Sequence, residues 1–429
     1  LSDEKTAQPL IRPLHILTIS ARSSEALKAL SERYINLLSM PEPPDLKDIC
    51  HTAATCRSHF EHRMAVVAKN SGQAVELLKM ASEGNPDQDI FQGRTGRRPR
   101  IVFLYTGQGS QYPNMGLELY KTQPAFKDAV DRCFDFIDRS GLSKLLPKPL
   151  AEVMFPQIYA AGKDTNIDSS IPNVSTGSSD AAKPVKPMNI FSFKPRIGTA
   201  ELDKTIYTQP AVFILEYALT ELWKSWGVFP DAVMGHSLGE YAAACAAGVL
   251  THEDGLRLLI ERANLMNALT DQGKMVSVFA RLDVVKEAVE PFKRKVSIAA
   301  INGPEIVLIS GFAAEVDLVV KELESRRLRT VQINISTAFH SPLTQQIMED
   351  FRSAAKSISY QVPIVPVISN LTGEPIGDSI CNADYWCSHM RQPVQFVKTL
   401  VHIRKNYDTL IEIGPAPNLV DLDMTLPEE

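Results

Sequence analysis

The sequence lacks a long apolar run, since no stretch of its 429 residues approaches the roughly 20 apolar residues of a membrane-spanning helix. It also lacks a strong excess of either charge: 45 Lys and Arg residues oppose 50 Asp and Glu residues, for a net charge of −5. This balance argues against a nucleic-acid-binding protein, which would carry a basic surplus. We expect a globular, cytoplasmic protein with enough chain for two or three domains and with neither a nucleic-acid nor a membrane partner.

Cysteine is scarce, and its six residues are thinly spread. They lack the tight spacing of a disulfide framework or a zinc site, and only His389 lies near the closest pair, Cys381 and Cys387. We therefore expect reduced thiols and no metal. The chain also begins at Leu1 without the charged and apolar pattern of a signal peptide, so we expect it to be a piece of a longer polypeptide.

What the sequence does contain is Gly235-His-Ser-Leu-Gly239, set between an apolar stretch and an alanine-rich, helix-forming run. The pattern is typical of a nucleophile elbow, in which a strand turns sharply into a helix and exposes the hydroxyl of Ser237. The flanking glycines remove Cβ atoms that would crowd this turn, and the Leu238 N–H points toward the site of an oxyanion. A residue at the position of His236 normally points away and supports the turn, and we group it with the lining of the substrate site.

A serine hydroxyl needs a base within hydrogen-bond reach, because its pKa lies far above neutrality. His340 follows a predicted strand in Thr337-Ala-Phe-His-Ser-Pro342, where a turn beside a proline can present an imidazole to a cleft. Alone, such a histidine is typical of a surface turn. Together with the elbow it predicts a catalytic base.

Two further side chains are candidates for the same site. Gln108 lies in a glycine-flanked turn at the carboxyl end of a predicted strand, where it either supplies a second oxyanion donor or only stabilises the turn. Arg262 lies on a predicted amphipathic helix. It either holds a substrate carboxylate through two hydrogen bonds or forms a salt bridge with Glu261 or Glu240, and spacing alone does not decide between these roles.

The periodicity of apolar residues predicts a small α/β unit at the start of the chain, with strands at 15–20 and 63–68 and a helix at 24–40. A strand at 101–105, followed by a glycine-rich turn, begins a second α/β unit. In this second unit Pro210 is expected to begin a long helix.

The segment between 275 and 335 has a different pattern, with predicted elements in the order βαββαβ. This order predicts a ferredoxin-like subdomain inserted after the elbow, so a cleft should lie between it and the main unit. A stretch at about 161–187 is rich in Ser, Asp, Lys and Pro, and we expect a mobile surface insertion there.

Taken together, the motifs resemble the acyltransferase domain of modular type I polyketide synthases, a family that includes malonyl-CoA:acyl carrier protein transacylases. The segments that carry the resemblance are Thr106-Gly-Gln-Gly-Ser110, Tyr207-Thr-Gln-Pro210, the elbow with Glu240-Tyr241, Arg262, Ala338-Phe-His-Ser341 and Glu412-Ile-Gly-Pro415. The N-terminal unit, with Arg12-Pro-Leu-His-Ile-Leu17 and Arg57-Ser-His-Phe-Glu-His-Arg63, resembles the linker domain between ketosynthase and acyltransferase.

The resemblance implies an α/β fold with an α/β-hydrolase-like large subdomain, built on a parallel sheet, at 98–272 and 341–420. It places the ferredoxin-like small subdomain at 273–340. A ketosynthase–acyltransferase linker domain would occupy 1–97, and a post-acyltransferase linker would occupy 421–429.

The resemblance also implies a two-step ping-pong reaction without a bound cofactor. Ser237, activated by His340, would attack the thioester of an acyl-CoA, and the phosphopantetheine thiol of an acyl carrier protein would then accept the acyl group. Gln108 and the Leu238 N–H would form the oxyanion hole, and Arg262 would grip the carboxylate of the extender unit. The implied partners are the carrier protein, the CoA thioester and an adjacent ketosynthase reached through the linker.

Two other roles are implied by motif position. Gln209 would line the substrate pocket. In this family a backbone carbonyl, in place of an aspartate, orients the catalytic histidine, and the matching position is assigned to His389, three residues before Gln392-Pro393.

Substrate choice in the family follows the tripeptide before the histidine. Thr337-Ala338-Phe339 is close to the His-Ala-Phe form associated with malonyl-CoA and unlike the Tyr-Ala-Ser form associated with methylmalonyl-CoA. Phe339 would fill the space that an α-methyl group needs. Thr337 departs from the expected histidine, which leaves hydroxymalonyl, aminomalonyl and methylmalonyl units as alternatives.

Two rival functions remain at this point. A serine hydrolase or thioesterase would use water in place of the carrier thiol, but such enzymes place an acidic residue between serine and histidine and have no use for a buried arginine. The second rival function is that of a non-enzymatic docking scaffold whose acyltransferase site has decayed. The intact set of Gln108, Ser237, Arg262 and His340 argues against it.

Overall fold

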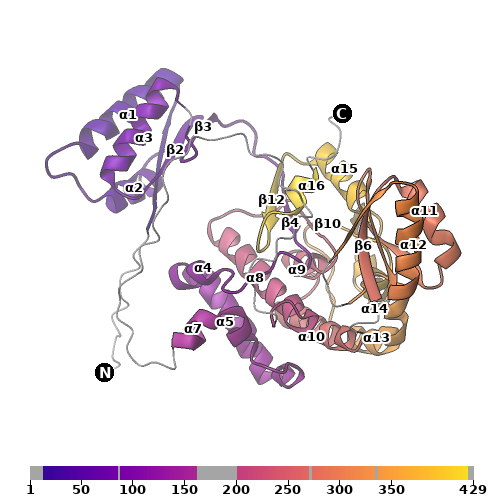
Figure 1. Cartoon of the computed structure of the whole chain (residues 1–429). Helices are drawn as coiled ribbons and strands as arrows, with labels where there is room; N and C mark the ends of the chain where they lie inside the picture. Colours follow the sequence, from indigo (N-terminus) through magenta and orange to yellow (C-terminus); the bar gives the residue numbers. More distant parts are fainter. Residues whose placement is uncertain (1–12, 86, 162–200, 270–272, 334–336, 424–429) are drawn as a thin grey trace, which may run out of the picture. The chain divides into compact units, whose positions relative to one another are not determined.

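The computed structural model describes residues 13–85, 87–161, 201–269, 273–333 and 337–423. The chain divides into two compact units, Leu1–Pro99 and Arg100–Glu429 (Figure 1). Almost all of the predicted insertion at about 161–187 lies outside the described residues. Its mobility stays a prediction.

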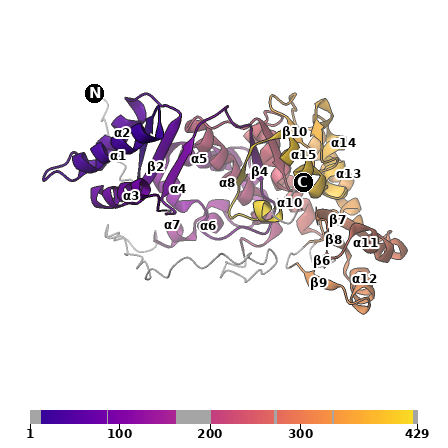
Figure 2. The same ribbon diagram turned by 90° about the horizontal axis from the view of Figure 1, so that it is seen from above.

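The first unit is a three-stranded antiparallel sheet with helices on one face. Its elements are β1 (His15–Ala21), α1 (Ser24–Leu38), α2 (Leu46–Thr55), β2 (His62–Ala68), α3 (Ser71–Glu83) and β3 (Ile90–Arg94). The strand order is β1-β2-β3, and α1 and α3 lie side by side (Figure 2). Alternate residues of β1, namely Leu17, Ile19 and Ala21, are buried in the core that these helices complete. The two strands and the helix predicted here are confirmed, whereas α2, α3 and β3 were not predicted.

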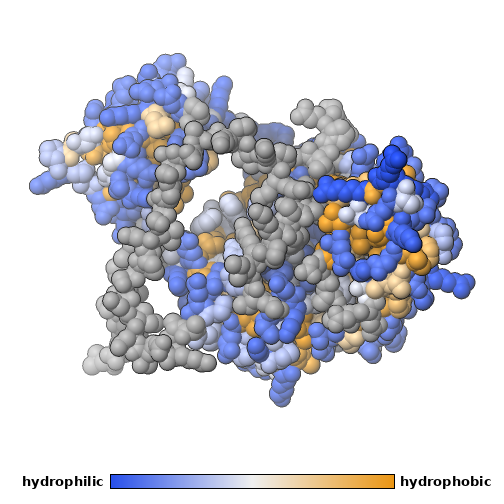
Figure 3. Space-filling model, in the orientation of Figure 1, coloured by the Kyte–Doolittle hydropathy of each residue, from blue (hydrophilic) through white to orange (hydrophobic). Residues whose placement is uncertain are grey.

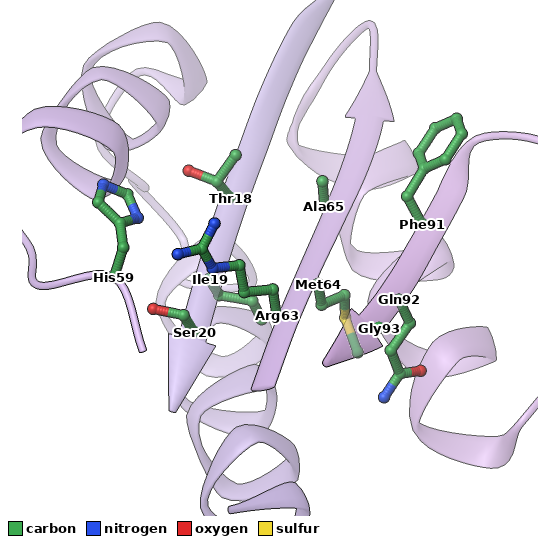
Figure 4. Close-up of a pocket in the computed structure, with 10 residues that line it drawn as sticks. All are labelled: Thr18, Ile19, Ser20, His59, Arg63, Met64, Ala65, Phe91, Gln92 and Gly93. Carbon is green, nitrogen blue, oxygen red and sulfur yellow. The ribbon is translucent and has the colours of Figure 1, made fainter. Parts of the chain in front are cut away.

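The opposite face of this sheet carries a pocket of about 570 Å³ (Figure 4). Its lining residues include Thr18, Ser20, His59, Arg63 and Phe91. Phe91 on β3 and Ile16 on β1 are each 57% exposed. The first unit therefore presents large apolar side chains on the face that the helices leave open.

The second unit contains a large subdomain built on a five-stranded sheet. Its elements before the small subdomain are β4 (Ile101–Tyr105), α4 (Leu117–Thr122), α5 (Pro124–Arg139), η1 (Leu142–Leu145), α6 (Leu150–Met154), α7 (Pro156–Ala161), α8 (Thr205–Ser225), β5 (Ala232–Gly235), α9 (Gly239–Ala246) and α10 (His252–Asn267). Those after it are η3 (Pro342–Ile347), α13 (Met348–Lys356), β10 (Val367–Ile368), β11 (Pro375–Ile376), η4 (Asp378–Ile380), α14 (Ala383–Arg391), α15 (Phe396–Asn406), β12 (Thr409–Ile413) and α16 (Leu419–Asp423).

The strand order of this sheet is β11-β10-β5-β4-β12, in which β10, β5, β4 and β12 run parallel and β11 pairs antiparallel with β10. The central strands are apolar and buried apart from Ile101 at the start of β4, because helices cover them. Parallel strands end at the same edge of a sheet. The turns that follow β4, β5 and β10 are therefore neighbours in space.

The expectation that Pro210 begins a helix is wrong. Helix α8 begins at Thr205, and Pro210 lies inside it. The reason is packing: Ile206 and Tyr207 are buried, so the apolar surface of the helix extends before the proline and outweighs the main-chain hydrogen bond that proline cannot donate.

The small subdomain is a four-stranded antiparallel sheet with two helices on one face (Figure 1). Its elements are β6 (Gly273–Phe279), α11 (Leu282–Val289), η2 (Glu290–Phe292), β7 (Val296–Gly303), β8 (Ile306–Phe312), α12 (Ala313–Ser325) and β9 (Arg329–Gln332). The element order and the strand order β7-β8-β6-β9 confirm the predicted ferredoxin-like pattern. The last strand is shorter than predicted, and residues 334–336 lie outside the described part of the chain.

Strand β7 joins the small subdomain to the large one. The Val394 N–H donates to the Ala299 carbonyl and the Ile301 N–H donates to the Val394 carbonyl, each at 2.9 Å.

None of the helices in the described ranges has both the length and the apolar character needed to cross a bilayer. The face drawn in Figure 3 is largely hydrophilic, with separate hydrophobic patches.

Candidate active site

The strand β5 turns sharply into α9 at Ser237, whose φ of 51° is in the left-handed region. Such a conformation is strained for a residue with a Cβ and persists only where the surroundings hold it. A Cβ on Gly235 would overlap main-chain atoms of Gly239 and Glu240, and a Cβ on Gly239 would overlap the Tyr105 carbonyl. The elbow therefore needs both glycines in order to close against the end of β4.

The hydroxyl of Ser237 lies 2.7 Å from Nε2 of His340, and Nδ1 of His340 lies 2.9 Å from the carbonyl oxygen of Gln392. A carbonyl only accepts hydrogen bonds, so Nδ1 carries the proton and Nε2 is left as the acceptor. This tautomer can take the proton of the serine hydroxyl. The acidic residue that a hydrolase triad would place on Nδ1 is replaced by a backbone carbonyl.

The sequence assigned this carbonyl to His389, whereas the hydrogen bond of Nδ1 goes to Gln392. The backbone of His389 is a smaller influence that also raises the pKa of His340, so its orienting role stays a prediction. His389 lies in the last turn of α14, whereas Gln392 is the first residue after the helix, and its extended backbone directs its carbonyl at His340. The ring of His389 is buried instead, with its centroid 6.2 Å from that of His340. Its ring packs edge-on beside the ring of the base.

Burial, together with the positive charge of Arg262, lowers the pKa of His340 to about 3. The imidazole is therefore neutral throughout the physiological range, which is the state that a general base requires. His236 points away from the dyad, as expected: its Nε2 lies 2.9 Å from Oδ1 of Asn302 on β7. This contact ties the elbow to β7 of the small subdomain. The place of His236 in the substrate lining stays a prediction.

The register of the central strands brings the two predicted oxyanion donors to the same edge. Tyr105 of β4 pairs with Gly235 of β5, and Gln108 and Leu238 each follow three residues later. Among the described residues, neither the Gln108 N–H nor the Leu238 N–H donates a hydrogen bond. Both are available to a negatively charged oxygen.

Arg262 is buried on α10, only 1% exposed. Its guanidinium lies 5.7 Å from the ring centroid of Tyr241 and 5.8 Å from that of Phe339, so aromatic rings flank it. Within the described ranges it forms no ion pair, and its Nε lacks a hydrogen-bond partner. Glu240 is held instead by Asn370 and Tyr385, so a salt bridge on a solvated face is not the role of this arginine. A buried cation without a counterion is costly, and an anionic ligand would relieve that cost.

The other predicted pocket residues gather around α10. Met266 lies one turn after Arg262; its Sδ accepts from Nε2 of Gln209 at 3.6 Å, and its carbonyl accepts from the Thr337 hydroxyl at 3.5 Å. Ala338 and Phe339 are buried next to Thr337. Helices α8 and α10 and the segment before His340 thus meet beside the dyad.

Several residues of this site were missed in the sequence. Asn370 accepts a hydrogen bond from the Ser237 N–H at 3.0 Å, and Ser297 of β7 donates to the His340 carbonyl at 2.7 Å. Burial raises the pKa of Glu240, which bonds Asn370, to about 7. The available signal was the polar pair Ser369-Asn370 after the apolar run of β10, next to the strand that carries the nucleophile. In the part of the chain that the structure describes, no group of three or more His, Cys, Asp or Glu side chains could hold a metal ion.

Comparison with known proteins agrees with this geometry. A family model described as the acyl transferase domain matches residues 102–424, and one described as CurL-like, PKS C-terminal matches residues 15–78. Polyketide synthase GfsA of Streptomyces halstedii is 34% identical over 399 residues, which cover 92% of this chain and 5% of that synthase. The chain therefore spans a small part of that relative's length.

Two solved structures are similar over nearly the whole chain. The acyltransferase domain from the second module of the salinomycin polyketide synthase is 33% identical with a TM-score of 0.70, and the match covers 95% of this chain and 85% of that one. The acyl transferase domain of SpnD, in complex with 2-(pent-4-yn-1-yl)malonyl, is 26% identical with a TM-score of 0.74 and coverage of 96% and 87%. These matches confirm the α/β fold class.

The elbow geometry makes Gly235→Ala strongly destabilising. Because the new Cβ would overlap main-chain atoms, which cannot rotate away, we expect the free energy of unfolding to fall by about 3 kcal/mol or more. Chemical denaturation measures the change. Gly93→Ala is the matched control, since nothing lies within 4 Å of its added Cβ. Equal stability of the two variants would contradict the close packing.

The lowered pKa of His340 predicts the pH dependence of Ser237 reactivity. A base that stays neutral far below its ordinary pKa keeps reacting as the pH falls, so acetylation of Ser237 by p-nitrophenyl acetate should lose rate only well below the usual range of histidine. Arg262→Ala removes a charge that lowers this pKa, so the acid limb should move to higher pH. Arg257→Ala, an exposed change on the same helix, is the control. Identical acid limbs in the wild type and Arg262→Ala would refute the coupling.

Proposed function

The chain belongs to the acyl transferase domain family and is the acyltransferase domain of a polyketide synthase, and from this premise we propose that it transfers a malonyl group from coenzyme A to a carrier protein. The observation that carries the choice of substrate is Arg262, a buried guanidinium beside the dyad without an anionic partner among the described residues. A malonyl group has a free carboxylate, which two parallel hydrogen bonds can hold.

In the proposed first step, Oγ of Ser237 attacks the thioester carbonyl while Nε2 of His340 takes the hydroxyl proton. The negative charge that develops on the carbonyl oxygen is received by the N–H groups of Leu238 and Gln108. The tetrahedral intermediate collapses, the C–S bond breaks, and the coenzyme A thiol leaves with the proton from His340. The malonyl ester of Ser237 remains.

In the proposed second step, the phosphopantetheine thiol of an acyl carrier protein gives its proton to His340 and attacks the ester. The C–O bond breaks, Ser237 regains its proton, and the acyl group leaves as a new thioester. One neutral histidine serves both steps because each begins with deprotonation of a nucleophile. Because the acyl group stays on Ser237 between the two steps, coenzyme A leaves before the carrier protein reacts, which is a ping-pong order.

The pocket supports malonyl over larger or more polar extender units. Phe339 is buried within 5.8 Å of the Arg262 guanidinium, so its ring occupies space beside a bound carboxylate. The Thr337 hydroxyl donates to the Met266 carbonyl of α10, so its proton is directed at the main chain and away from a bound acyl group. The SpnD relative holds a substituted malonyl group, which supports a carboxylated acyl class for this fold.

We assign contact with an adjacent ketosynthase to the first unit. Residues 15–78 match the CurL-like, PKS C-terminal family, and the open face of the sheet presents Ile16 and Phe91. An exposed apolar face of this kind is typical of a surface that another domain covers. The carrier protein is the remaining proposed partner.

A covalent ester on Ser237 is the direct test. After brief incubation with malonyl-CoA, intact-protein mass spectrometry should show one malonyl addition, which Ser237→Ala abolishes. Release of malonate to water without transfer to an added carrier protein would favour a thioesterase. No mass gain in the wild type, or a gain that survives Ser237→Ala, would refute the proposal.

Arg262→Ala should reduce malonyl loading far more than acetyl loading, because only malonyl has a carboxylate for the guanidinium to hold. Loss of one partner of a buried, hydrogen-bonded ion pair costs about 2–5 kcal/mol, so malonyl loading should fall by about 30-fold or more. Competition between malonyl-CoA and acetyl-CoA measures the ratio. Arg257→Ala is the control, and equal losses for both substrates in Arg262→Ala would exclude the carboxylate clamp.

A further inference from the structure

Asn370 is the most heavily used polar side chain around the elbow. Its Oδ1 accepts from the Ser237 N–H at 3.0 Å, and its Nδ2 donates to the Gly235 carbonyl and to Oε2 of Glu240. Its main-chain N–H also donates to Oε2 of Glu240, at 2.7 Å. One buried amide therefore binds the residue on each side of the turn as well as the nucleophile itself.

The side-chain amide of Asn370 bonds main-chain groups on both sides of the strained turn. Ser237 is in the left-handed region with φ of 51° and lies between the end of β5 at Gly235 and the start of α9 at Gly239. Oδ1 of Asn370 satisfies the Ser237 N–H, while Nδ2 satisfies the last carbonyl of β5. Only a side chain with both an acceptor and a donor can do this.

The main chain of Asn370 extends the same link to the base. Its carbonyl accepts from the Gln395 N–H at 2.8 Å. Three residues earlier, the Gln392 carbonyl orients Nδ1 of His340. The segment 392–395 is thus anchored at one end by Asn370 and holds the imidazole at the other.

We propose that Asn370 is the positioning residue of this site, fixing the Ser237 elbow and the loop that orients His340 in one register. The inference rests on the proposed function only for the identity of the acyl donor. Asn370 acts through Ser237 and His340, and its loss should slow acyl transfer to Ser237 without weakening the binding of the acyl donor.

Asn370→Ala tests the division between rate and binding. A displacement of about 1 Å in the reacting groups costs about 10²-fold in rate, so acylation of Ser237 by malonyl-CoA should slow by about that factor. The dissociation constant of malonyl-CoA, measured in Ser237→Ala and in the double variant, should stay unchanged. Asn382→Ala is the matched control: it removes an asparagine that caps the start of α14 and should keep the wild-type rate.

Asn370→Asp provides a second test that does not depend on the stability of the alanine variant. Its carboxylate can accept a hydrogen bond from the Ser237 N–H but cannot donate one to the Gly235 carbonyl. It also repels the carboxylate of Glu240, which lies on α9. The other titratable groups facing Glu240 are Tyr385 and His389, both from α14. The repulsion between the two carboxylates raises the pKa of the introduced one, and its protonation restores a donor to the Gly235 carbonyl. The rate relative to wild type should therefore rise as the pH falls from about 8 to about 5.5.

The outcomes separate this inference from the proposed function. If the wild type is not acylated by malonyl-CoA, the substrate is wrong, and p-nitrophenyl acetate then reports on the elbow in the same variants. Circular dichroism confirms that each variant is folded at the assay temperature. A folded Asn370→Ala with a wild-type acylation rate, or an Asn370→Asp whose relative rate does not change with pH, would overturn the role of Asn370.

Discussion

The parallel pairing of β5 with a strand on each side is the constraint on which the site depends. Because parallel strands end at one edge, β4 delivers Gln108, β5 delivers Ser237 and β10 delivers Asn370 to the same place. The turn at Ser237 is strained, and it holds its shape because glycines let its backbone meet β4 while Asn370 satisfies its N–H. The sheet therefore supplies the nucleophile together with its geometric support.

The electrostatics of the buried Arg262 and His340 would link substrate recognition to chemistry. Arg262 is buried without a counterion among the described residues, and its charge helps to keep His340 neutral. A carboxylate that binds Arg262 would cancel that charge, so the pKa of His340 would rise toward its ordinary value. A stronger base then forms where a carboxylated acyl group has bound. Under the proposed function, the same arginine would both orient the substrate and favour deprotonation of Ser237 once the substrate is in place.

The sequence predicted the features that local patterns encode. The elbow, the strand before it and the order of elements in the small subdomain follow from glycine placement and apolar periodicity over short stretches, whereas the fold class of the large subdomain was implied by the family resemblance. Gln392 was missed because the carbonyl that faces His340 depends on where α14 ends, and helix ends are the least certain part of a sequence-based prediction. Asn370 was missed because it lies 133 residues from Ser237, and only the pairing of β10 with β5 brings them together. The predicted helix start at Pro210 was wrong because burial of the residues before it outweighs the usual preference of proline for the first turn of a helix.

The two members of the dyad come from different subdomains, and this division explains why the small subdomain is inserted where it is. Ser237 follows β5 of the large sheet, whereas His340 lies after β9 of the small sheet, at the end of the predicted small subdomain, and has a left-handed backbone with φ of 53°. Ser297 of β7 bonds the His340 carbonyl, and Asn302 of the same strand bonds His236 beside the nucleophile. One strand of the small sheet therefore contacts the base and the residue next to the nucleophile. Because β7 is also joined to the large subdomain through Val394, a shift of the small sheet would move the base and the support of the nucleophile together.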